Sequence, residues 1–206
     1  MTPIDHGVRE SWDRIDGRLS AHVRKAPVRP AVDATRLRAV EAELAVTLPT
    51  DVREWWTLGN VRADYWIPGP FAPVTLEEAL ETREIWLLVA DQEESHFDRS
   101  GADEPRFLPE FMPIAMSPGG DGLIVDLRVG EHHGAVFLWD HERRGLGTPL
   151  WDSVGSMLQD IGVALGSRTP VLRRHTAPGG AEAACTGEGN GSGDQINDSA
   201  DRPHTA

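Results

Sequence analysis

The chain has 206 residues, 39% hydrophobic and 26% charged, enough for one well-packed globular core. Its formal charge of −13 disfavours nucleic acid as a direct ligand, because the phosphates would be repelled. An acidic surface suits a basic protein partner, although many soluble proteins are simply acidic. With Cys185 as the single cysteine, an internal disulfide and a thiolate metal cage are excluded. The first ten residues lack a basic segment followed by an apolar one, and the apolar run 85–90 is far shorter than the ~20 residues of a membrane span. We therefore expect a cytoplasmic protein.

Three amphipathic helices are predicted in the first sixty residues. The first should run from about residue 8 to residue 24, and the prolines of segment 26–30 should end it and form a linker. The second should begin at Asp33 or Thr35, since either residue can cap a helix. The third should follow Pro49, with Thr50 or Asp51 accepting the free backbone N–H groups. The apolar stripes are Trp12, Ile15, Leu19 and Val23; Leu37, Val40 and Leu44; and Val52, Trp55 and Trp56.

An irregular stretch rich in aromatic residues and proline covers residues 61–73. Tyr65, Trp66 and Ile67 are its best candidate for an extended piece. Tyr65 and Trp66 could anchor a partner, since aromatic residues dominate interface hot spots, or could pack under the loop.

A fourth helix is predicted by the capping box of Thr75 and Glu78, whose side chains can satisfy each other's free backbone donors. It should reach about Gln92. Segment 93–104 then carries five acidic residues and little apolar content, so we expect an exposed acidic loop. The residues that the helix should bury are Leu76, Ala79, Leu80, Leu87 and Ala90.

The stretch 117–142 predicts a β-hairpin at the centre of a sheet. Its two apolar runs, 123–125 and 135–139, do not alternate with polar residues, which indicates strands that are covered on both faces. The glycines of segment 119–122 favour a tight turn over a phosphate loop, because that segment precedes a strand and no Lys-Ser or Lys-Thr follows it.

Two groups in this hairpin could carry chemistry. His132 and His133 beside Glu131, with His141 across the hairpin, have suitable ligand types for zinc but no recognised spacing, so we assign no metal or other cofactor. Asp126 is either a buried acid or, as we favour, a structural acceptor for N–H groups of the loop. No catalytic residue is assigned.

A last helix should follow the capping pair Asp152-Ser153, with its apolar stripe at Val154, Met157, Leu158, Ile161 and Leu165. Segment 175–206 is rich in glycine and poor in large apolar residues, so we expect it to be disordered. It holds five acidic residues and one arginine, and the remainder, with 28 acidic and 19 basic residues, still carries −9. The domain should therefore cover residues 8–168, with an acidic tail at 175–206.

Several short motifs follow one another in a recognisable order. They are Val40-Glu41-Ala42-Glu43-Leu44, Leu48-Pro49-x-Asp51, Leu108-Pro109, Met112-Pro113-Ile114-Ala115, Gly120-Asp121-Gly122 with the strand up to Leu127, Gly134-Ala135-Val136 and Trp139-Asp140-His141-Glu142. This order resembles the SUKH superfamily, which includes the yeast Smi–Knr cell-wall-assembly regulators and many bacterial toxin-immunity proteins. The resemblance covers roughly residues 12–165, and the family usually has Leu-Gly where this chain has Leu44-Ala45.

The resemblance implies an α+β fold, in which a central and mainly antiparallel sheet has helices packed around it, and no enzymatic activity. It implies a protein-binding module, an immunity protein that neutralises a toxin domain such as a basic nuclease. The expected partner-binding residues are Tyr65, Trp66, Asp91, Glu93, Glu94, Asp98, Asp103 and Glu104. The expected structural motif residues are Pro49, Asp51, Gly120, Gly122, Asp126 and Gly134.

Two other classes of function stay open at this stage. One is a regulatory scaffold of the Smi–Knr type, in which the tail would be a binding segment. The other is a metal-dependent enzyme that uses His132, His133 and His141.

Overall fold

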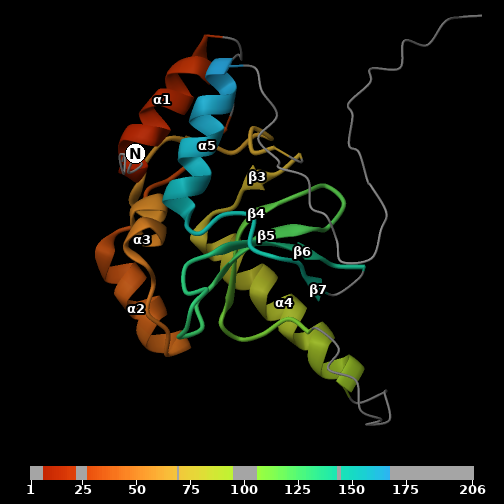
Figure 1. The fold of residues 1–206 in the computed structure, drawn as a ribbon. Coiled ribbons are helices and arrows are strands. Elements are labelled where there is room, and N and C mark those ends of the chain that lie inside the picture. Colours follow the sequence, from red (N-terminus) through yellow and green to blue (C-terminus); the bar gives the residue numbers. More distant parts are fainter. Residues whose placement is uncertain (1–6, 22–26, 69, 95–105, 143–144, 168–206) are drawn as a thin grey trace, which may run out of the picture. The chain divides into compact units, whose positions relative to one another are not determined.

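The computed structural model describes residues 7–21, 27–68, 70–94, 106–142 and 145–167 (Figure 1). All of them belong to the first of the two units into which the chain divides, Met1–His175. The expected tail at 175–206 lies outside the described residues, as does segment 95–105 of the expected acidic loop.

Three helices form the N-terminal part, as predicted, but the first ends at Ser20 and not near residue 24. Most of the expected stripes are buried, with Ile15, Val40 and Trp55 at 0% exposure, while Leu19 and Leu44 are partly buried and Val23 lies outside the described residues. Asp33 caps the second helix, since its Oδ1 accepts from the backbone N–H groups of Thr35 and Arg36. The helices are α1 Val8–Ser20, α2 Ala34–Leu44 and α3 Thr50–Thr57.

The predicted linker and the predicted extended piece differ from the structure. Val28–Arg29 of the linker forms strand β1, which pairs antiparallel with β2, Val61–Arg62. The extended piece was expected at residues 65–67, where the structure has only an isolated bridge between Ile67 and Phe71. Arg29 explains why a linker becomes a strand. Its buried guanidinium donates to the carbonyls of Trp55 and Val74 at 2.6 and 3.3 Å, which holds the backbone of β1 against α3.

The main sheet has five antiparallel strands in the order β3-β4-β5-β6-β7. The predicted hairpin is β5 with β6, and β5 is the central strand, so the prediction of its place is confirmed. The bounds are β3 Ala72–Pro73, β4 Phe111–Met116, β5 Gly122–Asp126, β6 Val136–Asp140 and β7 Gly145–Leu146.

Side chains of the hairpin alternate between two separate cores, one on each face of the sheet. Leu123 and Val125 pack with the core of α1, α2, α3 and α5, whereas Ile124 packs with a second core beneath α4. Figure 1 shows α4 on the opposite side of the sheet from α1 and α5. The architecture is therefore α+β, with a central antiparallel sheet covered on both faces by helices.

Two helices cover the sheet after β3, and both are capped as predicted. In α4, Leu76–Glu94, the backbone N–H of Thr75 donates to Glu78 Oε2 at 2.7 Å and that of Glu78 donates to Thr75 Oγ1 at 3.1 Å. In α5, Val154–Ser167, Ser153 Oγ accepts from the backbone N–H of Ser156 at 3.0 Å. Helix α4 continues to Glu94, two residues into the segment that was expected to be a loop.

The start of α3 contacts two distant parts of the chain. Asp51 Oδ1 accepts from the backbone N–H of Val52 in the first turn of α3, as expected, and its Oδ2 accepts from the backbone N–H of Gly155 in α5 at 3.0 Å. Pro49 lies against Gly134, where a Cβ would come within 3.1 Å of the proline Cγ and where φ is +92°. The backbone angle therefore favours glycine at position 134, and the contact leaves little room for a side chain there.

Gly122 lies directly beneath α4. A Cβ at this position would come within 2.6 Å of Cη2 of Trp86. The absence of a side chain thus lets the indole of α4 lie on the central strand.

Ala45→Gly should stabilise the protein by about 1 kcal/mol. Ala45 ends α2 in the left-handed conformation, with φ 53° and ψ 36°, which costs an L-residue roughly 1–2 kcal/mol but costs glycine almost nothing. The control Ala42→Gly, at an exposed position inside α2, should instead destabilise by about 0.5–1 kcal/mol. Thermal and urea unfolding would measure both changes. Equal destabilisation by the two substitutions would contradict a left-handed Ala45.

Asp51→Ala should cost about 1 kcal/mol of unfolding free energy, the usual cost of removing a helix cap. Asp51→Asn should recover part of the loss, because the amide oxygen still accepts a hydrogen bond. Glu54→Ala, which removes an exposed acid from the same helix, is the control and should have little effect. If Asp51→Ala is as neutral as Glu54→Ala in urea unfolding, Asp51 does not cap α5 in solution.

Candidate functional site: the solvent face of α4 and its surroundings

Of the two aromatic candidates for a partner contact, only Tyr65 presents its ring to solvent. Tyr65 is 60% exposed, whereas Trp66 is 8% exposed. The indole N–H of Trp66 donates to the carbonyl of Arg62 at 2.9 Å, and its ring packs 5.3 Å from that of Trp12. Trp66 is therefore a core residue, and we remove it from the expected contact surface.

The expected acidic contacts divide into two sets. Asp91 is exposed on α4, and Glu93 and Glu94 belong to the last turn of the same helix. Asp98, Asp103 and Glu104 lie outside the described residues. Among the described acidic candidates, the C-terminal end of α4 is thus the common location.

The same helix carries an exposed apolar row that the sequence analysis missed. Ile85, Leu88 and Val89 are 51%, 61% and 45% exposed and lie at i, i+3 and i+4, so they share one face. The missed signal was the wholly apolar run 85–90, which gives the helix apolar residues on both sides at once. Helical spacing assigned Leu87 and Ala90 to the core but left three apolar residues on the other side.

Carboxylates surround this row. Helix α4 has seven acidic residues and a single basic one, Arg83. Arg83 points away from solvent, since its Nε and Nη2 donate to the carbonyl of Pro109 at 2.9 and 2.6 Å. Burial lowers the pKa of Arg83, an effect that Glu110 and Glu84 oppose. The solvent face of α4 therefore combines an apolar row with negative charge. The acidic residues of α4 are Glu77, Glu78, Glu81, Glu84, Asp91, Glu93 and Glu94.

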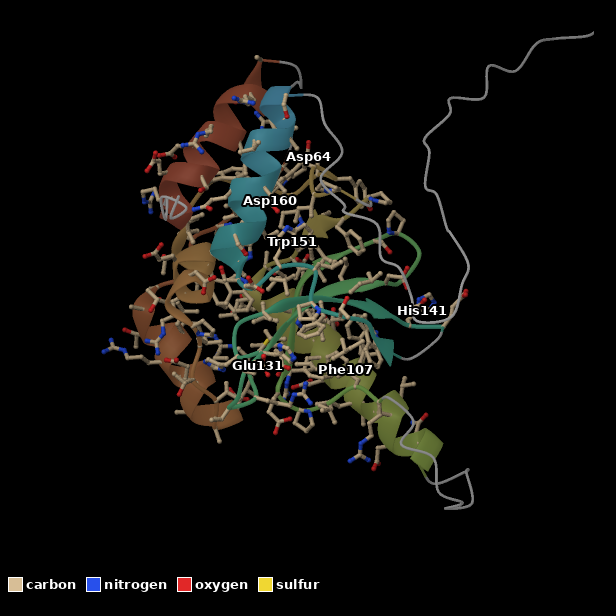
Figure 2. The ribbon with its side chains drawn as sticks, in the orientation of Figure 1. Asp64, Phe107, Glu131, His141, Trp151 and Asp160 are labelled. Carbon is tan, nitrogen blue, oxygen red and sulfur yellow. The ribbon has the colours of Figure 1, made fainter. Side chains whose placement is uncertain are left out.

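The histidines considered for a metal site do not come together. Gly122 pairs with Trp139 and Val125 with Val136, so His141 lies at one end of the hairpin and His132 and His133 lie at the other. Figure 2 shows Glu131 and His141 at opposite ends of the hairpin. Across the described ranges, there is no group of three or more His, Cys, Asp or Glu side chains that could hold a metal ion.

Asp126 is a buried carboxylate that pairs with the exposed Arg128 just after β5. Its carboxylate is 1% exposed and accepts from the backbone N–H of Arg128 at 2.9 Å and from Nη2 of the same arginine at 2.6 Å. The hydrogen bond to Asp126 raises the pKa of Arg128, whose guanidinium also lies 5.0 Å from the ring centre of Phe111. The geometry fits a carboxylate that fixes the loop after β5, the alternative that the sequence favoured.

A second polar pair closes the other end of the hairpin. His141 Nδ1 lies 2.9 Å from Asp121 Oδ1, which also accepts from the backbone N–H of His141 at 3.2 Å. The imidazole rests on the turn at Gly120, where φ is +97°. The hydrogen bond to Asp121 is the main cause of a raised pKa of His141.

Asp121→Asn should lower the pKa of His141 toward its ordinary value, because the hydrogen bond that contributes most to the increase loses its anionic acceptor. Since the pKa is raised in the folded state, this pair stabilises the fold below the unfolded pKa of histidine and loses its effect as the pH rises through the folded value. NMR titration of the imidazole protons would measure the shift. Glu142→Gln is the control and should change the pKa less. An unchanged pKa in Asp121→Asn would show that the pair is not formed in solution.

No helix among the described residues is both long and apolar enough to cross a membrane.

Comparison with known proteins gives a family for this arrangement. No curated protein matches the chain. The model of the SMI1 / KNR4 family (SUKH-1) matches residues 31–160, from the segment before α2 into α5, and so includes the α3 contacts, the whole main sheet and α4. The match spans more than half of the chain, and the chain therefore belongs to the SMI1/KNR4 family (SUKH-1).

Proposed function

We propose that this protein is a non-enzymatic binding module of the immunity type, which binds and neutralises a toxin domain with a basic surface. Membership of the SMI1/KNR4 family supports a protein-binding role. The observation that carries the specific proposal is the negative charge of the folded part, which remains −9 without segment 175–206. Opposite charge on the partner speeds encounter and favours correct pairing.

The proposed contact residues lie in two separate places, the C-terminal end of α4 and the exposed ring of Tyr65. Asp91, Glu93 and Glu94 supply charge there, and Tyr65 supplies an exposed ring of the kind that dominates interface hot spots. Asp98, Asp103 and Glu104 follow α4 directly in the chain and extend the proposal.

A second candidate is a regulatory scaffold of the Smi–Knr type, which the family itself suggests. In that case the tail at 175–206 would carry part of the binding. A toxin-binding module would instead bind through the surface described above, so the two candidates differ in what the tail contributes.

The purified protein should form a complex with a toxin domain encoded beside its gene and should protect cells that express that toxin. Because both surfaces are charged and exposed, the association rate constant should fall by about tenfold or more between about 20 mM and 500 mM salt. Stopped-flow mixing and co-expression would measure the two effects. Absence of both binding and protection, for every toxin domain encoded nearby, would refute the proposal.

Deletion of residues 175–206 separates the two candidates. The shortened protein should bind the toxin domain with unchanged affinity if the immunity proposal holds. Loss of binding on deletion would favour the scaffold candidate.

A further inference from the structure

We infer that the solvent face of α4 is a docking surface for an amphipathic helix of the partner, with lysine and arginine flanking a row of apolar residues. This inference rests on the proposed function and deepens it, because it identifies where the partner makes apolar contacts. The negative charge alone would attract any basic molecule, whereas the apolar row selects an amphipathic one.

The first observation is the geometry of the apolar row. Ile85, Leu88 and Val89 lie on the same face of α4 as Glu78 and Glu81, since Ile85 follows Glu81 by four residues and Glu78 by seven. An amphipathic helix reads such a surface through residues at i, i+3, i+4 and i+7, so one partner helix could contact the row and reach the carboxylates along it.

The second observation is that α4 is held rigidly from behind. Trp86 packs on Phe107 with ring centres 5.0 Å apart and on Trp139 at 6.2 Å, and it lies on the Cα of Gly122. Arg83 binds the carbonyl of Pro109 with two N–H groups. The exposed face therefore needs little ordering when a partner binds, which lowers the entropic cost of association.

The third observation is charge, which distinguishes a basic partner from a second copy of this chain. Two α4 helices packed face to face would place Glu78 and Glu81 of each copy in one interface, and the single arginine of α4 points into the protein. Like charges in an interface oppose association. A basic partner turns the same carboxylates into favourable contacts.

Two pairs of substitutions test the two components of this surface. Ile85→Ser with Leu88→Ser removes the apolar row, and Val163→Ser with Leu165→Ser is the matched control, because those residues are 62% and 39% exposed on α5.

Glu81→Lys with Glu84→Lys reverses the charge beside the row. Asp13→Lys with Glu54→Lys, at exposed positions on α1 and α3, makes the same change in net charge and is the control. Circular dichroism and thermal unfolding would verify that all four variants fold.

The full-length protein would be titrated by calorimetry with two probes. One is the toxin domain of the proposed function. The other is an 18-residue peptide of leucine and lysine that places all its leucines on one helical face, compared with a scrambled peptide of the same composition. We expect both α4 variants to weaken binding of the toxin domain and of the patterned peptide by about tenfold or more, and both controls to change it by less than about twofold.

The outcomes separate the two proposals. A toxin domain that binds all variants alike would overturn the α4 surface and leave the proposed function intact. A patterned peptide that binds through α4, when no toxin domain binds, would support the surface and count against the immunity role. Equal binding of the scrambled peptide would overturn the apolar component. A dimer in sedimentation that Ile85→Ser with Leu88→Ser disperses would overturn the basic partner in favour of a second copy.

Discussion

The fold depends on one short segment at the start of α3. The carboxylate of Asp51 accepts hydrogen bonds from the backbone of α3 and from the N-terminus of α5. Pro49 packs against Gly134 in the central hairpin. A helix N-terminus buried without acceptors would leave unpaired N–H groups, which is costly in a dry environment. The carboxylate of Asp51 therefore joins two helices, and the ring of Pro49 joins them to the hairpin, in one core. The family match includes all the partners in these contacts, which is consistent with a common structural frame.

Coverage of the sheet on both faces gives α4 its special place. On the main face, several helices pack against one another and bury most of their apolar surface. On the other face, α4 contacts the second core with Trp86 and Leu87, and its opposite side stays in solvent with Ile85, Leu88 and Val89. An apolar row on a firmly anchored helix costs solubility unless a partner covers it. One side of α4 thus packs on the sheet, and the opposite side carries the candidate binding surface.

Local features of the fold could be predicted from the sequence, and long-range features could not. The caps at Asp33, Thr75 and Ser153 join residues only two or three positions apart, so residue types alone indicate them. The contact of Asp51 with Gly155 spans 104 positions, and no local pattern predicts it. Trp66 was ambiguous for the same reason, since its burial depends on Trp12, which is far away in the chain. At the candidate site, the sequence alone shows that α4 is acidic. Its exposed apolar row could be identified only once the structure showed which side of the helix faces the sheet.

The tryptophans fall into two groups, one on each side of the sheet. Trp12, Trp55 and Trp66 share the main core, while Trp86 and Trp139 lie together on the opposite side of the sheet. Trp86 belongs to α4 and packs on Trp139 with ring centres 6.2 Å apart. A loosening of α4 would expose both of these indoles to water and shift their part of the intrinsic fluorescence to longer wavelength.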